Sequence, residues 1–290
     1  MATKYSNPPV IYTVAKLIYA DSIGSYSDEK YKKLLASLTS VGFDSYSLSK
    51  VMGIQFKQSD NQFSATPANA ERVGYFSPNR KRCALIDENT IELRLSEYDN
   101  HTRFLDEFKV LLDTCQKNEV ALGNKLREVE LHYVDLFVPE DCKLNDMFSS
   151  VSLPVGQFYS AGDDAIKIGA TNFTRILAKG TEKVSVSLEQ VFSSDPKRRK
   201  YLPDSLVEPD EKLGMPLDVS RLFKSQGQVE YAIVHTACGA LLESSKLNTE
   251  EIREKLEHLY RESRKTFDHM IEPNICGHVW QELDIKVEVE

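Results

Sequence analysis

Two short motifs in this sequence have the residue types and spacing of catalytic pairs. Ser47 and Lys50 stand three positions apart, the spacing at which a lysine base reaches a serine nucleophile when both lie on a helix. Asp284 and Lys286 form half of a carboxylate–lysine nuclease pattern. The Lys-Thr-Gly motif that accompanies the serine–lysine pair is missing, and no suitably placed acidic residue precedes Asp284. We therefore interpret both motifs as chance matches.

The motifs of the common nucleotide-binding and hydrolytic enzymes are absent from the sequence. It contains no GxGxxG, GxxxxGK[ST], GxSxG or HExxH pattern and no CxxC pair. Each of these patterns serves a mechanism that depends on its spacing, so its absence counts against that class of enzyme. The sequence therefore predicts no catalytic residues.

One stretch carries side chains that suit a small ligand. His132, Tyr133 and Asp135 lie on residues 126–138, whose alternation predicts a long strand. If a helix covers this strand, the tyrosine and the carboxylate can meet a ligand in a cavity between sheet and helix. The structural alternative is a hydrogen-bonded histidine on a strand, and His235 falls under the same alternative. We name His132, Tyr133 and Asp135 as candidate ligand-binding residues.

The histidines and cysteines do not form a metal-binding pattern. No two of the six histidines stand four residues apart, and the closest approach to a cluster is Cys276 with His278. One local pair cannot fill a four-coordinate site. We predict no metal and no cofactor.

Two segments could bind partners through charge or backbone pairing. The first is a basic run in an acidic protein, formed by Lys197, Arg198, Arg199 and Lys200. It is either a solvated loop or a contact for phosphate or an acidic protein. Nucleic-acid binding would need this run to join Arg80, Lys81 and Arg82 in one basic face, and the net charge of −8 disfavours it.

The second segment is the C-terminal tail. Ile285, Val287 and Val289 alternate there with charged residues, which is the pattern of a half-buried strand. Such a strand could pair with its own sheet, with a second copy of the chain or with another protein by strand addition.

The composition is that of an ordinary globular protein. The chain has 290 residues, of which 41% are hydrophobic and 28% charged. The five cysteines are odd in number and widely spaced, which favours free thiols in a reducing compartment. No apolar run has the length of a membrane span, and the N-terminus has no secretory pattern. We expect a cytoplasmic protein that makes no membrane contact.

The elements that would position these residues fall into two parts, residues 1–122 and 123–290. In the first part, Ser27 and Asn100 can cap helices with apolar positions at helical spacing. Strands are expected at 10–19, 51–56, 72–76, 82–86 and 90–95, with a polar loop at 58–67. In the second part, a helix begins after Asn248, and strands are expected at 126–138, 166–177, 184–191, 217–223 and 229–242.

Both parts follow the order strand, short helix, several antiparallel strands, long helix. This order predicts an α+β fold made of two similar antiparallel-sheet-plus-helix halves, each with a β-α-β(n)-α layout. The order resembles the TATA-binding-protein-like and helix-grip folds, a likeness of topology that implies nothing about function.

The chain also resembles a sporadically distributed, largely prokaryotic protein family of similar length. The resemblance rests on the proline pair in 7–10, the meander that ends at Tyr98 before a long helix, the strand at 131–135 before Pro139, and Trp280 after the last helix. His132 and Asp135 stand where that family has arginine and asparagine, so a shared binding site there does not transfer directly. The family has no established chemistry to carry over, and its sporadic distribution hints at defence or toxin–antitoxin-like systems.

Three functions are compatible with these features. The leading hypothesis is a non-catalytic interaction or accessory protein that binds another protein or a second copy of itself. The alternative is a small-ligand-binding protein, or an unrecognised enzyme, with a cavity between sheet and helix. The third is nucleic-acid binding through a local basic patch.

Overall fold

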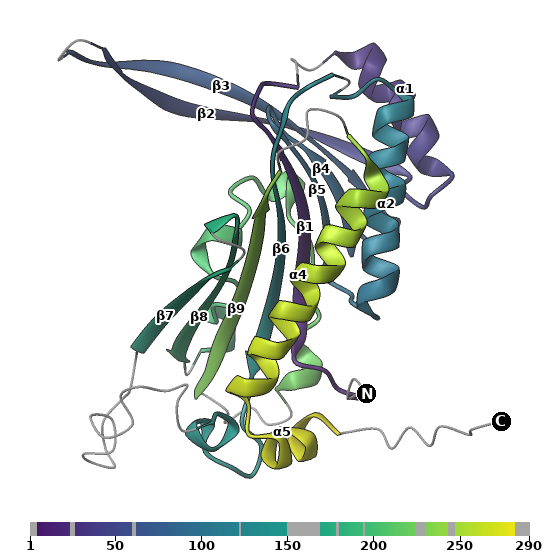
Figure 1. The fold of residues 1–290 in the computed structure, drawn as a ribbon. Coiled ribbons are helices and arrows are strands. Elements are labelled where there is room, and N and C mark those ends of the chain that lie inside the picture. Colours follow the sequence, from purple (N-terminus) through teal and green to yellow (C-terminus); the bar gives the residue numbers. More distant parts are fainter. Residues whose placement is uncertain are drawn as a thin grey trace.

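The chain folds into an antiparallel sheet with helices on one face (Figure 1). The computed structural model describes residues 5–23, 27–59, 62–121, 123–149, 169–177, 180–193, 195–223, 230–242 and 247–281. Within them the strands are β1 (Val10–Tyr19), β2 (Ser45–Ser59), β3 (Gln62–Phe76), β4 (Arg82–Ile86), β5 (Thr90–Leu95), β6 (Leu126–Phe137), β7 (Gly169–Leu177), β8 (Glu182–Phe192) and β9 (Glu230–Leu241). The helices of the described residues are α1 (Asp28–Thr39), α2 (His101–Lys117), α4 (Thr249–Met270) and α5 (Pro273–Trp280). This mixed class confirms the α+β class predicted from the sequence.

The sheet runs without interruption from one part of the sequence to the other. Its strand order is β2-β3-β4-β5-β1-β6-β9-β8-β7, so β1 and β6 are neighbours at its centre. They pair in antiparallel register, for example Thr13 with Tyr133 and Leu17 with Val129. The boundary that we expect between residues 122 and 123 falls in the connection from α2 to β6, and the sheet continues across it.

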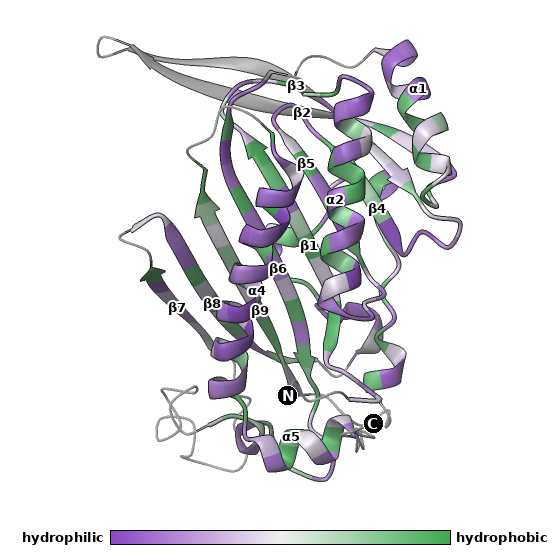
Figure 2. Cartoon of the chain, turned by 45° about the vertical axis from the view of Figure 1, so that its right-hand side comes forward, coloured by the Kyte–Doolittle hydropathy of each residue, from purple (hydrophilic) through white to green (hydrophobic). Residues whose placement is uncertain are grey.

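The helices cover one face of this sheet and bury its apolar side chains. In α2 the buried residues recur at helical spacing, from Phe104 and Phe108 to Cys115. Asn100 caps this helix and Asn248 caps α4, as the sequence predicts. Arg253 of α4 donates a hydrogen bond of 2.7 Å to Asp106 of α2 and so joins the two helices. Figure 2 shows hydrophilic residues along the outer side of α4, while hydrophobic residues mark the central strands.

Three expectations about the elements are wrong. The described residues of the polar loop expected at 58–67 belong instead to β2 and β3, which pair along their length. Only residues 73–76 of β3 also pair with β4, so the rest of the hairpin projects beyond the sheet (Figure 1). Its polar residues and Pro67 suit an edge ribbon, which local sequence does not distinguish from a loop. The expected strand at 217–223 contains instead a 3-10 turn, Ser220–Leu222.

The third error is that no helix is predicted at 273–280, where the chain forms α5. Pro273 starts this short helix, where its missing amide costs nothing, and Trp280 at its end is buried. The tail with Ile285, Val287 and Val289 lies outside the described residues.

Residues 195–223 cross the other face of the sheet and are held there by buried ion pairs. Glu208 accepts hydrogen bonds from Arg72 and from Arg94, the latter at 2.9 Å. Arg94 also donates to Glu92 at 2.7 Å. The side chains of Arg72, Arg94 and Glu208 are only 10%, 14% and 9% exposed. Because these charges are buried together, removing one of them leaves a buried charge without compensation.

We therefore expect Glu208→Ala to destabilise the protein by about 3–5 kcal/mol, the usual cost of removing one partner from a buried ion pair. Urea denaturation measures the change. Glu211→Ala removes an exposed carboxylate three residues away and is the matched control, with an expected change within about 0.5 kcal/mol. Equal losses in the two variants would contradict the structural role of Glu208.

Candidate functional site

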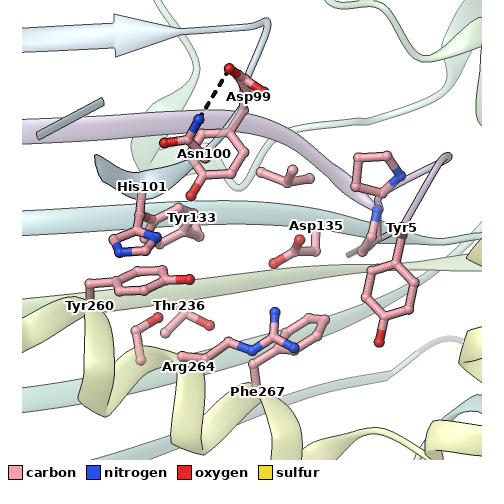
Figure 3. Close-up of a pocket in the computed structure, with 15 residues that line it drawn as sticks. Tyr5, Asp99, Asn100, His101, Tyr133, Asp135, Thr236, Tyr260, Arg264 and Phe267 are labelled. Carbon is pink, nitrogen blue, oxygen red and sulfur yellow. Dashed lines mark hydrogen bonds between the residues drawn. The ribbon is translucent and has the colours of Figure 1, made fainter. Parts of the chain in front are cut away.

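A cavity of about 340 Å³ lies between the sheet and helices α2 and α4 (Figure 3). Its wall is formed by β1, β6 and β9, by the first residues of α2 and by one side of α4. The residues that line it are Tyr5, Pro8, Pro9, Val10, Tyr98, Asp99, Asn100, His101, Tyr133, Asp135, Thr236, Tyr260, Ser263, Arg264 and Phe267. This volume lies within the range of sites for small organic ligands.

The sheet contributes Tyr133, Asp135 and Thr236 to the cavity. Side chains alternate between the faces of a strand, so Tyr133 and Asp135 point to the same side of β6. Thr236 of β9 is paired with Tyr133 and shares that side. Two of the three candidate ligand residues predicted from the sequence are therefore brought together.

The third candidate, His132, does not line this cavity, because alternation turns it to the opposite face. There its Nδ1 lies 3.1 Å from Nε2 of His235, and its Nε2 lies 3.3 Å from Glu130. Burial, with His132 as a further cause, lowers the pKa of His235 to about 4. The pair has the hydrogen-bonded arrangement that we considered as the structural alternative.

The proline pair forms the rim of the cavity, and an arginine from residues 195–223 fixes it. The carbonyl oxygen of Pro9 accepts a hydrogen bond from the Leu136 amide at 2.9 Å. The Arg221 guanidinium donates to the carbonyl oxygens of Pro8 and Val10 at 2.6 and 2.9 Å. Sequence reasoning missed Arg221. Prolines lack an amide donor but keep their carbonyl acceptors, which is the only local signal for such a partner.

Helix α4 contributes four lining residues at helical spacing. Tyr260, Ser263, Arg264 and Phe267 lie on one side of the helix, three and four positions apart. At the start of α2, the His101 ring stacks on Tyr260 with centroids 3.9 Å apart. The apolar positions of α4 were predicted, but its polar cavity residues were not.

Asp135 is the most unusual group in the wall. It is 6% exposed, and no hydrogen bond or ion pair joins its carboxyl to a residue of the described ranges. Burial raises the pKa of this carboxyl to about 7, although the charge of Arg264 acts to lower it. Arg264 itself pairs with Asp268 at 2.8 Å. This carboxyl therefore keeps its proton to a higher pH than an exposed aspartate does.

The tyrosines of the cavity stay neutral over a wide pH range. Burial raises the pKa of Tyr133 well above its ordinary value, and it also raises the pKa of Tyr98. The Tyr133 hydroxyl makes no hydrogen bond of standard geometry to a described residue, although it interacts electrostatically with the Tyr98 phenol. The Tyr133 hydroxyl is buried beside the Tyr98 phenol, so these two tyrosines contribute mainly their rings to the wall.

The basic run at 197–200 lies apart from the cavity and is partly engaged. The Arg199 guanidinium lies 4.2 Å from the centroid of the Phe223 ring, and the Lys200 ammonium lies 2.8 Å from Glu189. The exposed members are Lys197 and Arg198.

The second basic stretch is engaged along its length. It consists of Arg80, Lys81 and Arg82. The first donates to backbone carbonyl oxygens, the second pairs with Glu97 at 3.3 Å, and the third pairs with Glu107 at 3.0 Å. These contacts take up charge that a nucleic-acid surface would need.

Ser47 and Lys50, the serine–lysine pair of the sequence, both lie on strand β2. Residues three apart on a strand point to opposite faces, so the serine and the lysine cannot act together. This geometry agrees with a chance match.

Within the described part of the chain, no three histidine, cysteine or acidic side chains gather as they would around a metal ion. Among the same residues, no helix has both the length and the apolar character to cross a membrane. No protein-family model matches the sequence, and neither does any curated protein. The cavity is therefore interpreted from its own residues.

Asp135→Asn should stabilise the protein at high pH. In the folded protein the carboxyl holds its proton up to a pH of about 7, whereas in the unfolded chain it loses the proton near 3.8. Stability due to this group therefore falls as the pH rises from about 4 to about 7. Asparagine keeps the shape and never ionises.

We expect the Asp135→Asn substitution to add on the order of 3 kcal/mol to the free energy of unfolding at pH 8 and little at pH 4.5. Urea denaturation at both pH values measures the difference. Asp99→Asn, which changes a half-exposed carboxylate at the cavity edge, is the control and should show little dependence on pH. The same gain from Asp135→Asn at both pH values would contradict a raised pKa.

Proposed function

We propose that this protein binds a small organic molecule in the cavity between the sheet and helices α2 and α4. The observation that carries the proposal is Asp135, a buried carboxyl that faces an aromatic cavity without a hydrogen-bond partner among the described residues. A buried polar group without a partner costs stability, so it is retained where it serves a function. A mostly apolar cavity with a few converging polar groups is the usual form of a ligand site.

Catalysis is not needed to account for these groups. A carboxyl with a pKa of about 7 has the property of a general acid or base. Among the described residues, the lining contains no cysteine or lysine, and its one serine, Ser263, is hydrogen-bonded to no histidine. Binding alone accounts for an unpartnered carboxyl in the wall, and acid–base chemistry by Asp135 would be an addition to binding.

Ser263→Leu tests the proposal because it fills the cavity from α4. A library of small molecules is screened against the wild type by thermal shift, and hits are confirmed by calorimetry. We expect hits whose affinity falls at least tenfold in the Ser263→Leu variant. Arg261→Leu adds an apolar side chain on the exposed side of the same helix and should bind as the wild type does.

Urea denaturation of the free variants shows whether the Ser263→Leu protein folds. Hits that bind this variant, once shown to be folded, as well as they bind the wild type would place their site elsewhere and overturn the proposal.

A second candidate function is protein interaction, favoured by the β2–β3 hairpin. Most of its residue pairs lie beyond the last pairing with β4, so both outer edges of the ribbon are without a neighbouring strand in the described chain (Figure 1). An isolated two-stranded ribbon is marginally stable, and free edges pair readily with other strands. A second copy of the chain offers the same edges and is the partner that we propose.

Removing the projecting part tests this second function. Val51 is paired with Ala70, so an Asn-Gly turn can replace residues 52–69 without changing the rest of the sheet. We expect the full chain to form dimers at micromolar concentration in light scattering and the shortened chain to be monomeric. Cavity ligands should bind both forms alike, because the hairpin does not line the cavity. A monomeric full chain would overturn dimer formation through the hairpin.

The strand order also supports the proposed division into two similar halves. The first strands, β1 and β6, meet at the centre, and the last strands, β5 and β9, pair with them on the outside. Each last strand leads into a long helix, α2 or α4. We infer a duplicated β-α-β(n)-α unit of TATA-binding-protein-like or helix-grip-like layout, and membership of the resembled prokaryotic family remains a proposal beside it.

A further inference from the structure

We propose that the ligand of this cavity is a small organic amine, with a cationic nitrogen beside Asp135 and an aromatic or apolar body among the tyrosines. This inference rests on the proposed ligand-binding function and names the class of ligand.

The charges of the wall favour a cation. Arg264 is balanced by Asp268 at 2.8 Å, and Asp99 accepts a hydrogen bond from the Asn100 side chain at 3.1 Å. His101 lies 3.5 Å from Glu257. Asp135 is the lining carboxyl for which the described residues provide no such partner. A ligand that pairs with Asp135 must donate a hydrogen bond to its carboxyl. An ammonium group does so and also supplies a compensating positive charge.

The rings of the wall favour the same class. Tyr98 and Tyr133 meet edge to face with centroids 5.7 Å apart, and Tyr260 lies 6.1 Å from Tyr133. Aromatic faces carry negative potential and attract organic cations, an effect that grows when water is excluded. Rings also pack well against a flat apolar body. Figure 3 shows Tyr133 and Tyr260 on one side of Asp135 and Tyr5 on the other.

An anionic ligand is the main competitor, because α2 begins at the cavity and Arg264 lines it. The start of this helix is already capped, since the Asn100 side chain accepts the Arg103 amide at 2.9 Å. The Arg264 charge is shared with Asp268. An anion beside Asp135 would have to keep that carboxyl protonated, so the cavity would bind it poorly above neutral pH.

The test uses three probes with the same phenylethyl body and different charge: 2-phenylethylamine, 2-phenylethanol and 3-phenylpropanoate. Calorimetric titration of the full chain at pH 6 and pH 8 gives the affinities. We expect the amine to bind at least tenfold tighter than the alcohol at pH 8. Burial raises the pKa of Asp135 to about 7, so amine affinity should rise about tenfold from pH 6 to pH 8 as the carboxyl ionises. The affinity of the alcohol should be the same at both pH values.

Several other titratable or charged groups face the site or contact a group that lines it. They are Tyr5, Tyr98, Tyr133 and Tyr260, the Arg264–Asp268 pair, Asp99, and His101 with Glu257. His101→Gln is included as a control for the imidazole that lines the cavity, and the pH dependence should persist in it. Asp135→Asn should lose the preference for the amine and the pH dependence while it keeps the binding of the alcohol. Glu254→Gln, a charge change on the exposed side of α4, should behave as the wild type.

The outcomes separate the ligand class from the proposed function. Tighter binding of the alcohol or the acid, or equal affinity of the amine for the wild type and the Asp135→Asn variant, would overturn the amine class and leave ligand binding in place. Absence of binding by all three probes at millimolar concentration would overturn the amine class as well. The library hits and the Ser263→Leu variant then decide separately whether the cavity binds ligands at all.

Discussion

Pairing of β1 with β6 at the centre of the sheet is the interaction on which the rest of the structure depends. It joins the two parts of the chain into one sheet and sets the register of the strands on either side. The register also decides which side chains face the helices. Leu17, Val129 and Leu131 are buried on the helical side, whereas Glu130 and His132 turn to the opposite face. A shift of one residue would exchange these sets and expose the core.

The cavity lies where a polar layer interrupts the apolar helical face. Along β6, Tyr133 belongs to one buried cluster and Phe137 to the next, and Asp135 lies between them. Along α4, Ser263 lies in the same way between Leu259 and Phe267. Polar residues at facing positions of strand and helix cannot close the gap by apolar packing. The sheet is therefore continuous, whereas the apolar residues on its helical face form two clusters with the cavity between them.

Much of this architecture could be predicted from local sequence. The helix starts depend on capping by Ser27, Asn100 and Asn248, and each cap is formed as expected. Alternation predicts strand β6, and two of its three candidate residues, Tyr133 and Asp135, line the cavity, whereas His132 faces the other side. A strand at 51–56 was predicted, but the projecting hairpin was not, because residues 58–67 are polar and their pairing depends on the partner strand. The apolar side chains of residues 217–223 pack on the face of the sheet. The sequence pattern does not distinguish a segment that packs on a sheet from a strand that pairs within it.

The cavity was only half predictable for a related reason. A strand shows its two faces in its sequence, but a helix shows only that one side is apolar. Which polar residue at the margin of that side meets the sheet depends on how the helices pack, so Arg264 and His101 were missed. Arg221 reaches the rim from the opposite face, through contacts with residues more than 200 positions earlier. Non-local contacts of this kind leave no pattern in a single sequence.

Buried carboxylates of the sheet differ in whether a cation neutralises them. On the face covered by residues 195–223, burial alone would raise the pKa of Glu92, yet Arg94 and Lys16 hold it below its ordinary value. Glu208 likewise has two arginine partners. On the helical face, Arg264 does not come close enough to Asp135 to form an ion pair, and burial dominates. Glu92, Glu182 and Glu208 each have cationic partners, and Asp135 is the exception on which the proposed ligand site rests.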